Sequence, residues 1–268
     1  MSESASLSHG SVARLLERFR DLRIVVIGDV MLDEYFLGSV ERASPEAPVP
    51  VVKMGAESRG LGGAANVASV AAALGSAVEL MGVVGDDGAG DRFLAECEVA
   101  GIDATGVARV ADRPTTRKLR ILAQHQQVVR LDWEDSRPLP ESVGAARVEK
   151  LRASEPADAV VISDYSKGFL SPPILEGLIA VGRDWGVPIL VDPKSSDLTR
   201  YKGASVLKPN IHELEVVIGR RLMDDIEADL TEVSESILAS AEVETLVVTL
   251  GEKGMAVFSR EAEPFFVP

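Results

Sequence analysis

The stretch Ile24-Val25-Val26-Ile27-Gly28-Asp29, residues 24–29, sets the pattern on which the fold prediction rests. Four apolar residues in a row predict a strand that is buried on both faces, because a half-buried strand would alternate apolar and polar residues. Similar short apolar runs recur along the chain, at 78–84, 159–162, 189–191, 206–207 and 246–248. The sequence therefore predicts a sheet of buried strands.

Segments with helical spacing or with many small residues separate these apolar runs. Helices are expected at 63–74, 92–100, 172–185 and 211–219. Gly101, Gly186 and Gly219 stand where glycine commonly ends a helix. Alternation of strand and helix is typical of a parallel sheet with right-handed crossovers and helices on both faces. The expected fold class is therefore α/β, with three layers and a mostly parallel sheet.

Two segments break this alternation and predict a small second sheet. Residues 35–60 contain three prolines, and residues 115–132 read as two extended stretches joined by polar residues. Neither segment has helical spacing, and both are too polar for a buried central strand. We expect lid strands at about 34–60 and 112–132, inserted in a single domain that spans 1–268. Ligands of open α/β folds bind at the carboxyl edge of the sheet, which such a lid would cover.

The composition argues against several classes of protein. The 268 residues are 46% hydrophobic, which is enough for a sizeable core, and the net charge of −14 argues against nucleic acid and anionic membranes as partners. One cysteine and three histidines argue against a disulfide framework or a cysteine and histidine metal cluster. No signal peptide or membrane helix is apparent. We therefore expect a cytoplasmic globular protein.

Two motifs near the first strand carry candidate ligand-binding residues. Asp29 and Asp33 follow the run at 24–27, where carboxylates are costly to desolvate unless they bind something such as sugar hydroxyls. Alternatively, Asp29 caps the backbone of a turn. Gly62, Gly63 and Asn66 lie where a helix is expected to begin, and they could bind a ligand or allow close helix packing. This motif is not the dinucleotide fingerprint, because its spacing differs and no expected strand directly precedes it.

Two further motifs follow the apolar runs at 206–207 and 246–248. Asn210 is a natural N-cap, and Glu213 three residues later would complete a capping box. Alternatively, Glu213 faces the cleft and holds a hydrated Mg²⁺ near nucleotide phosphates. Thr249, Gly251 and Gly254 belong either to a hairpin loop or to a glycine loop that passes along such phosphates.

Cations gather in one segment of this acidic chain. Residues 113–120 carry four arginines or lysines, Lys118 among them, which form either a solvated strand or a lid surface that suits a phosphorylated substrate. Lys167, in the motif that begins with Asp164, and Lys194 each follow a buried strand. Both lysines are therefore expected at the same edge of the sheet.

Taken together, six motifs resemble the ribokinase-like (phosphofructokinase B) family of carbohydrate kinases. They are GDVMLD at 28–33, GLGGAANVA at 60–68, VVGDDGAGDRF at 83–93, VDPK at 191–194, KPNIHE at 208–213 and VTLGEKG at 248–254. Within the family, LDEYFLGSVERASPEAPVPVVK, RPTTRKLRILAQHQQVVRLD and SDYSKG are most similar to the D-glycero-β-D-manno-heptose 7-phosphate kinases of ADP-heptose synthesis, which serves the lipopolysaccharide core.

This resemblance implies a ribokinase-like fold with a small β lid, and ATP with Mg²⁺ as cofactors. It implies that the substrate side comprises Asp29, Asp33, Gly62, Gly63, Asn66, Lys118, Asp164 and Lys167. It implies that the nucleotide side comprises Lys194, Asn210, Glu213, Thr249, Gly251 and Gly254, with Glu213 reaching the metal through water. The implied reaction is transfer of the ATP γ-phosphoryl group to the anomeric hydroxyl of heptose 7-phosphate, giving the 1,7-bisphosphate. Such transfers depend mainly on positioning and charge stabilisation.

The sequence departs from the family pattern at its end. The family's catalytic aspartate lies in a Gly-Ala-Gly-Asp motif after the nucleotide loop, and the sequence ends at Pro268, before that motif is expected. Asp91 completes the same four letters, but in a different context, where helix capping by Asp86 or Asp87 is the better interpretation. The expectation is thus a C-terminally incomplete kinase domain, with its catalytic base beyond Pro268, which binds a sugar phosphate without turning it over.

Other functions remain open at this point. The chain could be a kinase for another sugar or a nucleoside, or a non-catalytic sugar-binding protein that lacks the catalytic aspartate. A small-molecule sugar phosphate is the expected partner. A homodimer through the lid strands is also expected, because exposed sheet edges need cover.

Overall fold

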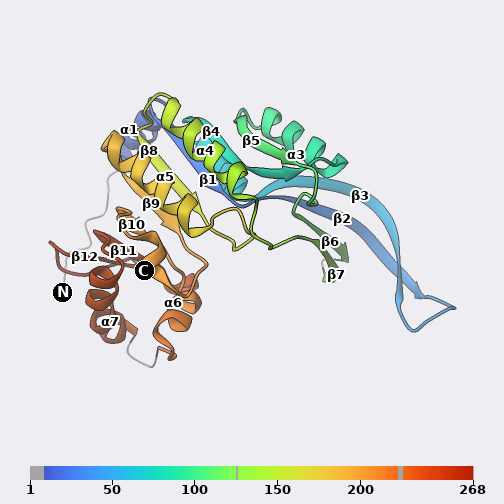
Figure 1. Cartoon of the computed structure of the whole chain (residues 1–268). Helices are drawn as coiled ribbons and strands as arrows, with labels where there is room; N and C mark the ends of the chain where they lie inside the picture. Colours follow the sequence, from blue (N-terminus) through green and yellow to red (C-terminus); the bar gives the residue numbers. More distant parts are fainter. Residues whose placement is uncertain (1–8, 125, 223–225, 268) are drawn as a thin grey trace.

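The computed structural model describes residues 9–124, 126–222 and 226–267. Most of the polar N-terminal segment and Pro268 therefore lie outside the described residues. A large sheet forms the body, and a second sheet projects from it (Figure 1). The large sheet comprises, in spatial order, β13 (Phe265–Val267), β12 (Met255–Ser259), β11 (Thr245–Thr249), β10 (Val206–Leu207), β9 (Ile189–Asp192), β8 (Ala159–Ser163), β1 (Arg23–Gly28), β4 (Ala77–Gly85) and β5 (Asp103–Val110). From β11 to β5 every neighbouring pair is parallel, whereas β12 and β13 pair antiparallel.

Helices cover both faces of this sheet. They are α1 (His9–Phe19), α2 (Ala64–Ala73), α3 (Gly88–Val99), α4 (Glu141–Ala153), α5 (Pro172–Trp185), α6 (Ile211–Ile218) and α7 (Ile226–Ser240), with short 3₁₀ turns at Leu198–Tyr201 and Gly251–Lys253. Among the residues that the structure describes, no helix is long and apolar enough to cross a membrane.

The core confirms that β1 is buried on both faces. Val25 and Ile27 belong to a hydrophobic cluster shared with α4, α5 and α7. Val26, which points the other way, belongs to a second cluster shared with α2 and α3. Side chains alternate along a strand, so a continuous apolar run serves two helical layers at once. The three-layer, mostly parallel α/β prediction is therefore confirmed.

Helix α3 begins earlier than the sequence predicts, and Asp87 is the reason. The Asp87 carboxylate accepts a hydrogen bond from the N–H of Gly90 at 2.8 Å, which caps the helix four residues before the expected start. Asp91 consequently lies in the first turn of this capped helix, as the capping interpretation predicts. The same carboxylate also accepts from the hydroxyl and the N–H of Thr115, at 2.7 and 2.9 Å.

Replacing Asp87 with alanine is expected to lower the free energy of unfolding by about 2 kcal/mol at pH 7, because the cap and a buried Thr115 both lose their partner. Burial alone would raise the pKa of Asp87, but the hydrogen bonds from Thr115 and Gly90 hold it below its ordinary value. A lowered folded-state pKa means that this stabilisation is present above the unfolded-state pKa and is lost as the pH falls through the folded-state pKa.

Urea unfolding of wild type and variant at pH 7 and at pH 3 measures this effect, and the difference should shrink in acid. The neighbouring exposed residue supplies the control, since Asp86→Ala should change the free energy of unfolding by less than about 0.5 kcal/mol. Equal losses for Asp86→Ala and Asp87→Ala at pH 7 would contradict the capping role.

The second sheet has the strand order β3-β2-β6-β7. Its strands are β2 (Val30–Ala43), β3 (Pro50–Gly63), β6 (Arg117–Ala123) and β7 (Gln126–Trp133). Strand β2 begins one residue after Asp29, so Asp33 lies in a strand of the lid and not in a turn. Strand β3 runs directly into α2, so the expectation that no strand precedes that helix is wrong.

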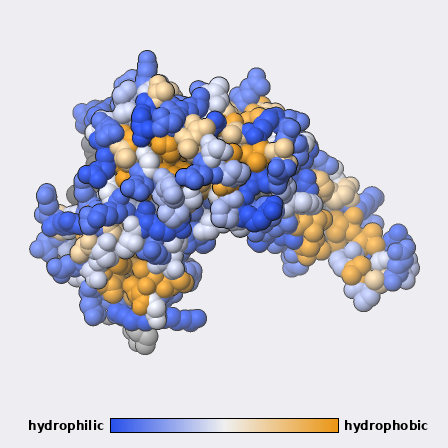
Figure 2. Space-filling model, in the orientation of Figure 1, coloured by the Kyte–Doolittle hydropathy of each residue, from blue (hydrophilic) through white to orange (hydrophobic). Residues whose placement is uncertain are grey.

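The two faces of this second sheet differ in chemistry. Lys118 on β6 lies opposite Asp33 on β2 and Asp132 on β7, which gives a charged face. Leu119 lies opposite Leu131, and alternate β7 side chains on that side are apolar and exposed. Apolar residues gather on the projecting part of the lid in Figure 2. That side of the lid is therefore apolar along β7, but it also carries Glu34 of β2, which is buried, and Arg117 of β6, and these two residues form an ion pair.

Candidate active site

The predicted site residues follow neighbouring strands of the large sheet. Asp29 follows β1, Asp164 follows β8, Lys194 follows β9 and Asn210 follows β10. These four strands are adjacent and parallel, so their carboxyl ends share one edge of the sheet. Both lid segments leave the body at this edge, because β2 follows β1 directly and β6 pairs with β2. The topology thus places the substrate-side and nucleotide-side motifs along one continuous edge.

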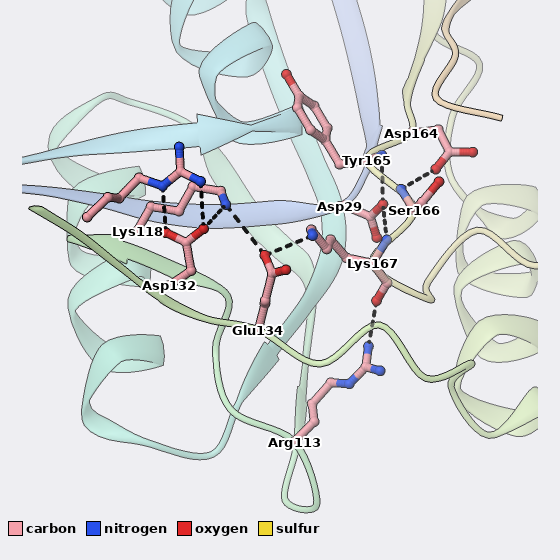
Figure 3. A network of polar contacts seen from close by, with 10 residues as sticks. Asp29, Arg113, Lys118, Asp132, Glu134, Asp164, Tyr165, Ser166 and Lys167 are labelled. Atoms are coloured by element: carbon pink, nitrogen blue, oxygen red, sulfur yellow. Dashed lines mark hydrogen bonds and ion pairs between the residues drawn. The ribbon is translucent and has the colours of Figure 1, made fainter. Parts of the chain in front are cut away.

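Asp29 is buried, with 3% of its surface exposed. Its Oδ2 accepts hydrogen bonds from the N–H groups of Tyr165 at 2.8 Å and Lys167 at 3.0 Å (Figure 3). Burial raises the pKa of Asp29, and these N–H donors act against that rise. Asp29 does accept backbone N–H groups, as the turn interpretation expects, but they belong to the loop after β8 and not to its own turn.

The loop after β8 is fixed by its own buried carboxylate. Asp164 accepts from the N–H of Ser166 at 2.7 Å and from the hydroxyl of Tyr201 at 2.7 Å. Ser166 has a φ of 54°, the left-handed region that non-glycine residues seldom adopt. Asp164 therefore orders the backbone that presents Tyr165 and Lys167 to Asp29. The role of Tyr201 was not predicted, because this residue lies in none of the six motifs.

Arg113 connects the start of the lid to this loop. Its guanidinium is largely buried and donates to the carbonyl oxygens of Lys167, at 3.2 Å, and of Arg137. It also lies 3.9 Å from the Asp135 carboxylate. The cation-rich segment was expected to contact a substrate phosphate, whereas the N–H groups of Arg113 donate to backbone carbonyl oxygens. Arg113 therefore has a structural role, although it belongs to that segment.

Lys118 and Lys167 come together from different sheets. One oxygen of Glu134, Oε2, lies 2.8 Å from Lys167 Nζ and 3.4 Å from Lys118 Nζ (Figure 3). Lys118 also lies 3.1 Å from Asp132, which Arg130 holds through two hydrogen bonds. The two predicted substrate-side lysines are therefore adjacent, beside Asp29 and Asp33. Glu134, which joins them, was not predicted.

The glycines of the second motif allow the end of β3 to lie close to both aspartates. A Cβ on Gly62 would lie 2.4 Å from Asp33 Oδ2, and one on Gly63 would lie 2.3 Å from the Asp29 carbonyl oxygen. Glycine is therefore required at position 63, where the contact is with backbone, whereas at position 62 the Asp33 and Met31 side chains would have to shift. Asn66 lies in the first turn of α2 and is exposed. Its place beside the aspartates fits a hydroxyl ligand, which stays a prediction.

The nucleotide-side residues gather around the start of α6. Asn210 and Glu213 form the expected capping box, with reciprocal hydrogen bonds of 2.9 and 3.0 Å. The other Glu213 oxygen lies 3.0 Å from Lys194 Nζ. Thr249, Gly251 and Gly254 line an open pocket of about 520 Å³ together with Asn210. The loop that carries them also forms the hairpin between β11 and β12.

The chain is similar in sequence to a family of carbohydrate kinases and to several of its curated members. Residues 21–268 match the family described as pfkB family carbohydrate kinase. The chain is 41% identical over 263 residues to the bifunctional protein HldE of Geobacter metallireducens, and 44% identical over 258 residues to that of Halorhodospira halophila. These alignments cover 96% and 94% of this chain but 52% of each relative, so the chain spans about half the length of the curated relatives it matches.

Solved structures share the fold at low identity. The tetrameric inhibited form of Escherichia coli phosphofructokinase-2 has a TM-score of 0.72 at 21% identity, over 92% of this chain and 79% of that one. Arabidopsis thaliana ribokinase, complexed with ribose and ATP, has a TM-score of 0.69 at 19% identity, over 92% and 77%. The fold is therefore ribokinase-like. With the family match over residues 21–268, the chain belongs to the pfkB family of carbohydrate kinases.

Proposed function

We propose that this chain binds heptose 7-phosphate as part of a kinase that transfers the ATP γ-phosphoryl group to the anomeric hydroxyl of that sugar, giving heptose 1,7-bisphosphate for ADP-heptose synthesis. Membership of a carbohydrate kinase family supports the reaction class. Relatives named HldE, together with the motif resemblance described above, support the choice of heptose. The observation that carries the proposal is the convergence of Lys118 and Lys167 on one oxygen beside Asp29 and Asp33.

The substrate side of the proposed site separates two kinds of group. The carboxylates of Asp29 and Asp33 suit sugar hydroxyls, which donate hydrogen bonds to them. Lys118 and Lys167 suit the phosphate at the far end of the sugar, since ammonium groups bind phosphate as point charges. A sugar lacking that phosphate would make no ionic contact with either lysine, and both would keep the carboxylate partners that they have in the free protein. The site therefore favours a phosphorylated sugar over a free sugar or a nucleoside.

The nucleotide side would bind ATP along the pocket between α6 and the loop after β11. Both Glu213 oxygens already have partners, Asn210 and Lys194. A hydrated Mg²⁺ carried by the nucleotide phosphates would therefore contact Glu213 through one of its water ligands. The metal supplies neutralisation of phosphate charge. Lys194 and the backbone N–H group of Gly251 would hold the phosphates, whereas the N–H of Gly254 is donated to the Gly251 carbonyl oxygen at 3.1 Å. This assignment of Lys194, Asn210, Glu213 and Thr249 is part of the proposal.

Binding and transfer are measured separately to test this function. Calorimetry compares heptose 7-phosphate with free heptose, fructose 6-phosphate, ribose and adenosine, and ³¹P nuclear magnetic resonance follows transfer from Mg-ATP. Tightest binding of heptose 7-phosphate by this chain is the expected result, and a new anomeric phosphate resonance is expected with a chain that includes the Gly-Ala-Gly-Asp motif. Preference for a nucleoside or a free sugar would contradict the proposal. Binding of heptose 7-phosphate without transfer by the chain that includes the motif would favour the non-catalytic sugar-binding alternative.

We also propose that the exposed apolar side chains of β7 in the lid pair with a second copy of the chain. Val129, Leu131 and Trp133 alternate along β7, and each is about 40% exposed. Leu131→Glu should convert a dimer to a monomer in sedimentation velocity, whereas Val99→Glu, at an 84% exposed position on α3, should not. A monomeric wild type, or a dimeric Leu131→Glu variant, would contradict this pairing.

A cytoplasmic location is proposed because the reaction consumes ATP.

A further inference from the structure

We infer that Glu134 is a specificity residue of the proposed sugar-phosphate site: its carboxylate holds Lys118 and Lys167 together in the free protein and is displaced by the phosphate of the substrate. This inference rests on the proposed function, because it concerns the same two lysines. Nothing in the sequence pattern pointed to Glu134, which directly follows the last lid strand.

The geometry places a carboxylate oxygen where a phosphate oxygen would bind. Glu134 Oε2 lies 2.8 Å from Lys167 Nζ and 3.4 Å from Lys118 Nζ. Lys167 is fixed beside Asp29 through its own N–H, and Lys118 lies next to Asp33 across the β2–β6 pair. A sugar held by these two aspartates would therefore bring a phosphate substituent toward the oxygen that Glu134 now occupies.

The local charges favour exchange of a carboxylate for a phosphate. Lys118, Lys167 and Arg130 carry three positive charges, and Asp132 and Glu134 carry two negative charges. Asp132 keeps Arg130 and Lys118 as partners when Glu134 leaves. A phosphate dianion in place of Glu134 would then balance the cluster. A neutral sugar cannot make this exchange, because it would leave two lysines, each less than one-fifth exposed, without sufficient negative charge.

Glu134 can leave without disturbing the lid. Its side chain is 34% exposed, and the residue lies just outside β7, so its backbone takes no part in the β6–β7 ladder. In the free protein, the Glu134–Lys167 pair connects the end of the lid to the loop after β8. In the complex, the phosphate would make that connection through Lys118 and Lys167. Substrate binding thus replaces the Glu134–Lys167 ion pair with an ion pair between the lysines and the substrate phosphate, which a free sugar lacks.

The test compares Glu134→Gln with wild type and with Glu98→Gln, which removes the same charge from an exposed position on α3. Calorimetry measures heptose 7-phosphate, free heptose and inorganic phosphate with each protein. Glu134→Gln should bind heptose 7-phosphate and inorganic phosphate about fivefold more tightly, the size expected for removal of a partly exposed competing ion pair. Free heptose should change by less than about twofold. Glu134→Asp, whose side chain is too short to reach both lysines, should give a smaller increase.

Lys167→Met separates the two ways in which this account can fail. In the first case, wild type prefers heptose 7-phosphate and Lys167→Met loses that preference, but Glu134→Gln binds heptose 7-phosphate no more tightly than wild type. The phosphate site is then correct, and the exchange role of Glu134 is wrong. If wild type binds heptose and heptose 7-phosphate equally and Lys167→Met changes neither, the proposed phosphate site is wrong, and the inference is overturned with it.

Discussion

Asp29→Asn is expected to weaken binding of heptose 7-phosphate by about a hundredfold, while ATP binds as tightly as before. Two effects add. The amide is a weaker acceptor than a carboxylate for sugar hydroxyls, and hydrogen bonds to charged groups contribute about 1.5–3 kcal/mol each. The same change weakens the hydrogen bonds from Tyr165 and Lys167, so the loop that carries Lys167 is held less firmly.

Calorimetric titration with heptose 7-phosphate and with ATP measures both ligands on one preparation. Asp86→Asn is the matched control, because this exposed aspartate also follows a strand of the large sheet but lies after β4. Thermal unfolding shows whether the variant is folded. An Asp29→Asn protein that is folded and binds heptose 7-phosphate within about threefold of wild type would show that Asp29 serves the loop alone.

Gly63→Ala is expected to lower the free energy of unfolding by about 3 kcal/mol or more. Gly63 has φ 58° and ψ −134°, a combination that residues with a Cβ adopt only with strain. An added Cβ would also lie 2.3 Å from the Asp29 carbonyl oxygen, which is backbone and cannot rotate away. Relief of this contact would move α2 away from β1, and Asn66 away from Asp29.

Gly101→Ala is the control for backbone conformation alone. Gly101 has a φ of 70°, but an added Cβ there would meet nothing within 4 Å. Its substitution should cost about 1 kcal/mol, the usual penalty for a left-handed residue with a Cβ. Urea unfolding of both variants measures the difference. Equal losses at the two positions would contradict the tight contact between Gly63 and Asp29.

Elements with local signals were predictable from the sequence. Helix α5 matches its predicted range of 172–185, because prolines begin it and Gly186, in the left-handed conformation, ends it. The buried strands were equally clear, since their apolar runs need no partner to be recognised. Strand β5 gave no such signal: it is an edge strand, and Gly106 is its only buried residue. Its sequence therefore does not resemble a central strand.

The site was predictable in its residue types but not in its pairings. Asp29, Asp33 and Lys167 were expected at one edge because strand ends share an edge in a parallel sheet. Glu134 was missed, and Arg113 was predicted only as one cation of the lid, because each has a partner in the loop after β8 and only the register of the lid brings them there. The sequence shows an acidic and basic lid, but it does not show which charges already neutralise one another.

A crystal structure of the chain with heptose 7-phosphate tests the central claim most directly. The account predicts that the phosphate lies within hydrogen-bonding distance of both Lys118 Nζ and Lys167 Nζ, that Asp29 and Asp33 accept from sugar hydroxyls, and that Glu134 has moved away from the lysines. A sugar phosphate bound elsewhere, with the 2.8 Å contact between Glu134 and Lys167 intact, would contradict it.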